Sequence, residues 1–215
     1  MQQRRVGRTG LTVSSIGLGT MTWGRDTDEH DATEQLEAFL EAGGTLLDTA
    51  ATYGEGASEA LIGRLLGASV DRQDVVLVSK AGVRSRRTAD GGGVVDASRG
   101  SLLDTLDDSL DRLGTDHLDL WLVQTPDPAT PLEETLGALE HAVATGRTRY
   151  VGLSNYPAWT TAQAATMLRA GPVPGLPPSR SSTRCCSAAS SGRSYRQRAR
   201  WARGCWRGHR SGAGC

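Results

Sequence analysis

The sequence contains almost no lysine and, over most of its length, no cysteine. Lys80 is the only lysine among 215 residues, whereas arginine occurs 23 times. The four cysteines are Cys185, Cys186, Cys205 and Cys215. Residues 1–178 therefore have no disulfide framework of the kind that indicates secretion. We expect a cytoplasmic protein, and we treat the single lysine as a candidate for chemistry.

Long apolar runs are also missing. No stretch approaches the ~18 apolar residues that a membrane-spanning helix needs. The opening residues, MQQRRVGRTGLTV, are not followed by the apolar core of a signal peptide. Charge is divided unevenly, because all 24 acidic residues lie within 1–178, while nine arginines and no acid lie within 179–215. The two parts therefore carry formal charges of −9 and +9. Because long apolar runs are missing, we expect no membrane association.

Residues 1–171 alternate short apolar runs with longer amphipathic segments. The short runs predict strands over 14–21, 45–50, 74–82, 118–124 and 148–155. The longer segments predict helices over 28–44, 58–68, 98–114, 130–146 and 158–171, with Ser58 as an N-cap. The basic, glycine-rich segment 83–93 is expected to be a loop. Repeated strand–helix pairs of this length indicate a parallel α/β architecture.

Two parallel architectures fit this alternation, an open doubly wound sheet and a (β/α)8 barrel. The open sheet would favour a dinucleotide fingerprint, G-x-G-x-x-G, after the first strand. The segment GLGTMT at residues 17–22 has only two of the three glycines. We therefore predict an incomplete TIM barrel, with an N-terminal hairpin and five of the eight β/α units.

Polar residues cluster where the predicted strands end. They are Asp48, Tyr53, Lys80, Gln124, Ser154 and Asn155. Each one alone is readily explained as a cap, a packing residue or a solvated loop charge. Together they end successive strands, and in a barrel the carboxyl ends of the strands form the mouth where catalytic groups gather.

These residue types suggest a way to protonate a carbonyl oxygen. A phenol with a pKa near about 10 is a poor acid at neutral pH. An ammonium group beside it favours the phenolate, and a carboxylate holds the ammonium in place. Tyr53, Lys80 and Asp48 could thus form a general acid. The hydroxyl of Ser154 and the amide of Asn155 could hold a carboxamide such as that of nicotinamide.

The sequence resembles the aldo-keto reductases over residues 1 to about 171. The segments that carry the resemblance are RRVGRTGLTVSSIGLGTMTWG, GGTLLDTAATYGEGASEALIGRLL, VLVSKAG and GRTRYVGLSNY. The resemblance implies a TIM barrel that binds NADP(H) and transfers hydride to a small-molecule aldehyde or ketone. It implies Asp48, Tyr53 and Lys80 as catalytic residues, and Ser154, Asn155 and Asp48 as cofactor-binding residues. We predict no metal and no specific protein partner.

One position departs from the family pattern. The family's tetrad usually has a histidine at the end of the fourth strand, where this sequence has Gln124. A glutamine amide donates a hydrogen bond but does not titrate, so we expect Gln124 to orient the substrate and Tyr53 to transfer the proton. Trp23 is expected to line the substrate pocket, with a packing role as the alternative. The departure also leaves open a non-catalytic regulator of the kind found among channel subunits.

The tail does not resemble the missing part of a barrel. We interpret 172–178 as a Pro/Gly linker and 179–215 as a disordered Arg/Cys/Ser-rich tail, because it lacks Leu, Ile, Val, Met and Phe. Its arginines allow a nucleic-acid arm, which we do not expect, and its cysteine spacing fits no zinc motif.

A shift of the reading frame explains the tail better. Read two bases on with GC-rich codons, SRSSTRCCSAASSG gives AVEYSLLQRGIER, and GCWRGHRSGAGC gives LLAWSPLGRGV. These two segments resemble the family's sixth and seventh strands. The hypothesis is a frameshift near 172–180, and it predicts that this chain binds NADPH weakly and turns over little.

Overall fold

The computed structural model describes residues 1–7, 9–85, 93–170 and 185–188. Its central element is a six-stranded sheet in the order β10-β9-β8-β5-β4-β3, and every neighbouring pair is parallel. The strands are β3 (Gly17–Gly19), β4 (Leu46–Asp48), β5 (Val76–Ala81), β8 (Leu118–Val123), β9 (Thr148–Ser154) and β10 (Cys185–Ala188). Among the described residues β3 and β10 are free edges, so these strands form an open part of a barrel.

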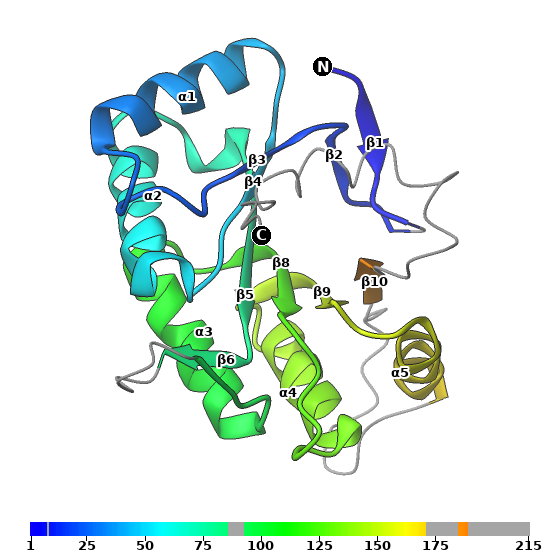
Figure 1. Cartoon of the computed structure of the whole chain (residues 1–215). Coiled ribbons are helices and arrows are strands. Elements are labelled where there is room, and N and C mark those ends of the chain that lie inside the picture. Colours follow the sequence, from blue (N-terminus) through cyan, green and yellow to red (C-terminus); the bar gives the residue numbers. More distant parts are fainter. Residues whose placement is uncertain (8, 86–92, 171–184, 189–215) are drawn as a thin grey trace, which may run out of the picture.

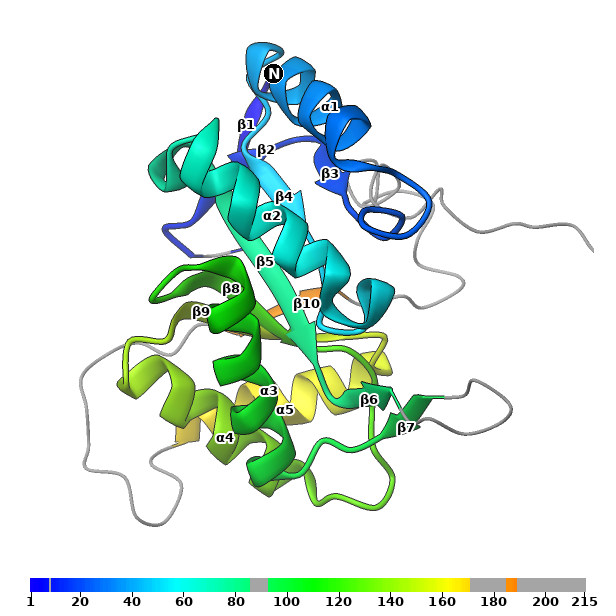
Figure 2. The same cartoon turned by 90° about the vertical axis from the view of Figure 1, so that its left-hand side faces the viewer.

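A helix follows each of the five strands β3, β4, β5, β8 and β9, which confirms the predicted order of β/α units. The helices are α1 (Glu29–Glu41), α2 (Ala57–Ala68), α3 (Arg99–Leu113), α4 (Leu132–Ala144) and α5 (Ala158–Ala170). Short 3-10 turns, η1 (Tyr53–Gly56) and η2 (Arg72–Asp74), lie before and after α2. The helices follow one another around the outside of the curved sheet (Figures 1 and 2). This arrangement leaves the inner face of the sheet for a different set of side chains.

The alternation of side chains along each strand separates two apolar clusters. Outward positions such as Leu77 and Trp121 pack with helix residues such as Leu106 in the main core. Inward positions of the same strands, Val78, Leu120 and Leu122, form a second cluster. Because neighbouring residues of a strand point to opposite faces, each strand contributes to both clusters. Polar residues that continue the inward series must therefore lie on the inner face.

An antiparallel hairpin of β1 (Gln3–Arg5) and β2 (Thr12–Ser14) lies at the amino ends of the strands. The Ser14 hydroxyl accepts hydrogen bonds from the backbone N–H groups of Thr45, at 2.9 Å, and Leu46, at 3.2 Å. These bonds attach the hairpin to the residues that open β4. The N-terminal hairpin expected from the sequence is thus present.

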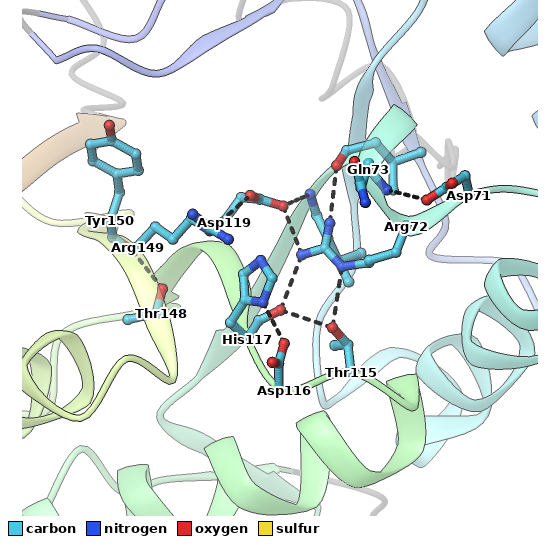
Figure 3. A network of polar contacts seen from close by, with 12 residues as sticks. Asp71, Arg72, Gln73, Thr115, Asp116, His117, Asp119, Thr148, Arg149 and Tyr150 are labelled. Carbon is cyan, nitrogen blue, oxygen red and sulfur yellow. Dashed lines mark hydrogen bonds and ion pairs between the residues drawn. The ribbon is translucent and has the colours of Figure 1, made fainter.

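A polar network closes the amino ends of β5 and β8 (Figure 3). The Arg72 guanidinium donates to the Asp119 carboxylate at 2.8 Å and to the carbonyl oxygens of Val75 and His117, each at 3.0 Å. The same Asp119 oxygen accepts from the backbone N–H of Leu77 at 2.9 Å. Three of these four bonds involve backbone groups at or beside strand ends, so the network stabilises the sheet.

Two segments differ from expectation. Residues 83–93, expected to be a loop, contain β6 (Val83–Ser85), whose partner β7 (Gly93–Val95) completes an antiparallel hairpin. Valines favour strands. The absence of a side chain at Gly93 lets β7 lie close to β6, since a Cβ there would be 2.9 Å from Val83 Cγ1.

The second correction concerns the tail, for which no strand was expected. Cys185–Ala188 form β10, which pairs with Val151–Ser154 of β9. An edge strand presents unpaired backbone groups that accept a partner whatever its side chains are, so apolar residues were not required. The linker 172–178 and the rest of the tail lie outside the described residues.

Candidate active site

The inner face carries a row of polar residues at the carboxyl ends of the strands. Asp48 continues the inward series of β4, and Lys80 that of β5. Gln124 directly follows β8, and Ser154 ends β9. In register, Lys80 lies opposite Leu122, a member of the inner cluster. Side-chain alternation thus brings four of the sequence-predicted residues to one edge of one face.

Lys80 is the centre of this group. Its side chain is only 6% exposed, and its ammonium donates to Asp48 Oδ1 at 2.8 Å, to the Thr49 carbonyl at 2.9 Å and to the Tyr53 hydroxyl at 3.4 Å. An ammonium has three N–H donors and no acceptor, so these contacts use all of them. Because Tyr53 oxygen accepts from Lys80, the phenolic hydrogen remains free to point toward a substrate.

The charge state of Lys80 follows from two opposed effects. Burial lowers the pKa of Lys80. The charges of Asp48 and Tyr53, together with their hydrogen bonds, raise this pKa by more than burial lowers it, so the net shift is upward. The ammonium also lies 5.0 Å from the centre of the Tyr53 ring. Lys80 is therefore a permanent cation at neutral pH, suited to stabilise negative charge on the Tyr53 oxygen.

Tyr53 is carried by a tight turn between β4 and α2. Three consecutive residues after it have positive φ, Gly54 at 58°, Glu55 at 55° and Gly56 at 93°. Left-handed backbone costs a non-glycine residue such as Glu55 about 1 kcal/mol. Strained backbone persists only where surrounding contacts fix it, so the conformation of this turn beside Tyr53 is fixed by its surroundings.

Gln124 and Asn155 extend the site toward β9. The Thr52 hydroxyl donates to Gln124 Oε1 at 3.2 Å, so the Gln124 side chain touches the residue beside Tyr53. Asn155 Nδ2 donates to the Gln124 carbonyl at 2.8 Å and to Ser154 Oγ at 3.2 Å. Asn155 is exposed and has a φ of 60°, which turns its side chain back over the strand ends. The structure therefore links Gln124, Ser154 and Asn155 directly.

A second tyrosine near the site is a poorer acid. Tyr156 follows Asn155 and is only 4% exposed. Burial, assisted by the negative charge of Asp127, raises the pKa of Tyr156 to about 12. Tyr156 is therefore poorly suited to give up a proton, and Tyr53 is the tyrosine whose hydroxyl contacts the Lys80 ammonium.

Two sequence expectations near the site are decided by burial and capping. Of the two roles left open for Trp23, the structure shows packing, because Trp23 is fully buried in the main core and donates to Gln35 Oε1 of α1 at 3.0 Å. Ser58 is not the N-cap of α2, since Gly56 holds that position. Sequence reasoning also missed Thr49, whose backbone carbonyl rather than its side chain holds Lys80. The residue type carries no signal for such a contact.

Within residues 1–7, 9–85, 93–170 and 185–188, no group of three or more His, Cys, Asp or Glu side chains is placed to hold a metal ion. No helix in that part of the chain is long and apolar enough to cross a membrane.

Comparison with known proteins identifies the family and the architecture. The aldo/keto reductase family profile matches residues 15–174. The chain is similar to a solved aldo-keto reductase, AKR11C1 from Bacillus halodurans in its holo form, with 32% identity, a TM-score of 0.69, and coverage of 77% of this chain and 54% of that one. This chain belongs to the aldo/keto reductase family, a family of NAD(P)H-dependent oxidoreductases built on the TIM barrel.

Two curated relatives are named reductases. The chain is 35% identical over 161 residues to aldo-keto reductase YhdN of Bacillus subtilis, covering 73% of this chain and 47% of that protein. It is 35% identical over 184 residues to L-glyceraldehyde 3-phosphate reductase of Escherichia coli, covering 82% of this chain and 51% of that protein. The chain thus spans about half the length of the curated relatives it matches. These relatives do not support the alternative of a non-catalytic regulator.

Proposed function

We propose that this site reduces the carbonyl group of a small aldehyde or ketone, with NADPH as the cofactor. The observation that carries the proposal is the contact of Tyr53 and Asp48 with one buried ammonium, that of Lys80, at the carboxyl end of the sheet. The acid, its activating cation and the group that holds the cation are thus all present.

Ser154 and Asn155 suit the nicotinamide carboxamide. A carboxamide both donates and accepts hydrogen bonds, and a serine hydroxyl with an asparagine amide offers both partners. Asn155 is held by two bonds to neighbouring strand ends, which fixes its orientation before any ligand arrives. When bound, the cofactor supplies a hydride to the carbonyl carbon.

The protein side of the reaction is a proton transfer. The Tyr53 O–H donates its proton to the carbonyl oxygen, giving an alcohol and leaving a phenolate. The Lys80 ammonium stabilises that phenolate, and Asp48 keeps the ammonium in place. Gln124 adds an amide that orients the carbonyl oxygen but does not exchange a proton with it.

Tyr53→Phe tests the proposal. The variant keeps the ring against Lys80 and removes only the acidic hydroxyl. We expect the full chain to show slow carbonyl-dependent NADPH oxidation and the variant to lose it by a factor of ~10² to 10⁴. The measurement is NADPH absorbance with a panel of aldehydes and ketones, with Tyr156→Phe as the matched control. Carbonyl-dependent oxidation that Tyr53→Phe leaves intact would overturn the proposal.

A further inference from the structure

Ser58 and Glu59, consecutive polar residues at the start of α2, are fully buried. Neither is assigned a role by the mechanism above. α2 begins directly after the turn that carries Tyr53, so whatever fixes its first residues also fixes one end of that turn. Their two side chains bind different parts of the molecule.

Ser58 connects α2 with the ends of β3 and β4. Its hydroxyl donates to the Thr20 carbonyl at 2.9 Å, and it lies 2.8 Å from Thr20 Oγ1 and 3.0 Å from Thr49 Oγ1. Thr49 opens the segment that carries Tyr53, and its carbonyl holds Lys80. One buried cluster of hydroxyls therefore holds residues 50–57 at both ends.

Glu59 connects α2 with the strand that presents Lys80. Its carboxylate accepts from the hydroxyl of Ser79, the residue before Lys80, at 2.5 Å. The other oxygen accepts from Nε of Arg112 on α3 at 2.8 Å, and it forms an ion pair with Nη2 of the same guanidinium at 2.7 Å. Both carboxylate oxygens are thus satisfied, and the helix is tied to β5 next to the catalytic candidate.

The Arg112 side chain also packs closely against Gly56 in the turn. A Cβ at Gly56 would lie 2.8 Å from Cδ and Nε of Arg112, so only glycine allows this approach. The turn before α2 is strained, with positive φ at Glu55 as well as at its glycines. Strained backbone persists where surrounding contacts over-determine it, and here those contacts come from Arg112 and from the cluster around Ser58.

The ion pair of Glu59 and Arg112 is weak evidence of a contribution to stability. Replacing a buried ion pair by apolar residues of similar volume is often neutral or stabilising. We propose that Ser58 and Glu59 are positioning residues that hold the Tyr53 hydroxyl against the Lys80 ammonium. They act through Thr49 and Ser79 and do not touch the reacting atoms. Only the description of the Tyr53–Lys80 pair as catalytic rests on the proposed function.

The single lysine allows a direct test. Lys80 is the only lysine in the chain, so 15N-lysine labelling of the full 215-residue protein gives one side-chain ammonium signal. We expect Ser58→Ala and Glu59→Gln each to shift this signal. We also expect both to speed the exchange of the ammonium protons about fivefold, the factor given by the loss of one hydrogen bond. Ser79→Ala, which removes only the hydroxyl between Glu59 and β5, should behave in the same way and provides the test if Glu59→Gln does not fold.

The matched control is Asp119→Asn at the opposite end of β5 and β8. It weakens the network of Figure 3 and should lower stability while leaving the Lys80 signal and its exchange unchanged. The proposal is overturned if Ser58→Ala, Glu59→Gln and Ser79→Ala lower the free energy of unfolding but leave the Lys80 signal as it was. It is equally overturned if Asp119→Asn changes that signal as much. The readout needs no turnover, so an absence of carbonyl reduction would count against the proposed function alone.

Discussion

At the amino end of the sheet Arg72 pairs with Asp119, and at the carboxyl end Lys80 pairs with Asp48, in both cases at 2.8 Å. The guanidinium directs two further donors at backbone carbonyls and thus completes strand ends. The ammonium directs one of its donors at Tyr53, a group that can give up a proton. The same kind of ion pair therefore serves stability at one end and chemistry at the other.

The residue types suit these tasks. A guanidinium is a flat fork that matches several acceptors at once, whereas an ammonium is a compact charge with three freely placed donors. Lys80 is also more buried than Arg72, with side chains 6% and 21% exposed respectively. In a chain with 23 arginines, the one lysine stands where a compact charge is needed.

The largest effect is expected from Lys80→Met. The variant leaves the mostly buried carboxylate of Asp48 without its cation, and breaking such a pair costs about 3 kcal/mol. Urea unfolding measures this loss, and carbonyl-dependent NADPH oxidation should fall at least as far as in Tyr53→Phe. In the double variant Lys80→Met/Asp48→Asn part of the stability should return, because the isolated charge is gone. A Lys80→Met protein of unchanged stability would remove the basis of the comparison.

A smaller effect is expected from Arg72→Met at the amino end. The variant removes the partner of Asp119 and the donors to two backbone carbonyls, which we expect to cost about 2 kcal/mol. Urea unfolding again gives the loss. The titration of the Lys80 ammonium should remain that of the wild type. A shifted Lys80 titration in Arg72→Met would mean that the two ends of the sheet are coupled.

Much of this division could be predicted from the sequence. Apolar periodicity located the five β/α units, and strand-end position selected Asp48, Lys80, Gln124 and Ser154. The buried positions of Trp23 and Ser58 could not be predicted, because each depends on contacts with segments distant in sequence. From the sequence alone, a tryptophan after a strand that lines a pocket cannot be distinguished from one that packs in the core.

The role of Glu59 was hidden for a related reason. A glutamate in the first turn of a helix ordinarily indicates a favourable interaction with the helix dipole on the surface. Here the same residue is fully buried, since Ser79 and Arg112 reach it from two other elements. The strand β10 could not be predicted from side-chain patterns either, because it is held by backbone pairing with β9.

The smallest effect is expected on stability at low pH, through the Asp127 carboxylate in the loop that follows β8. The Asp127 carboxylate accepts from the backbone N–H of Ala97 at 3.0 Å, the hydroxyl of Thr130 at 2.7 Å and the backbone N–H of Ala129 at 2.8 Å. These bonds, first that from Ala97 and then that from Thr130, lower the pKa of Asp127. A lowered pKa in the folded state contributes stability above the unfolded pKa of about 4, and this stability is lost as pH falls through the folded value.

Asp127→Asn separates this contribution from the rest. We expect the variant to lose no more than about 1 kcal/mol at pH 7, because an amide oxygen still accepts from some of the same donors. Its free energy of unfolding should then fall less steeply than that of the wild type below pH ~4. Urea unfolding at a series of pH values measures both quantities. The control Asp104→Asn removes a carboxylate that is 77% exposed and should leave the slope nearly unchanged. Equal slopes for Asp127→Asn and the wild type would show that acid weakens this end of the sheet through other groups.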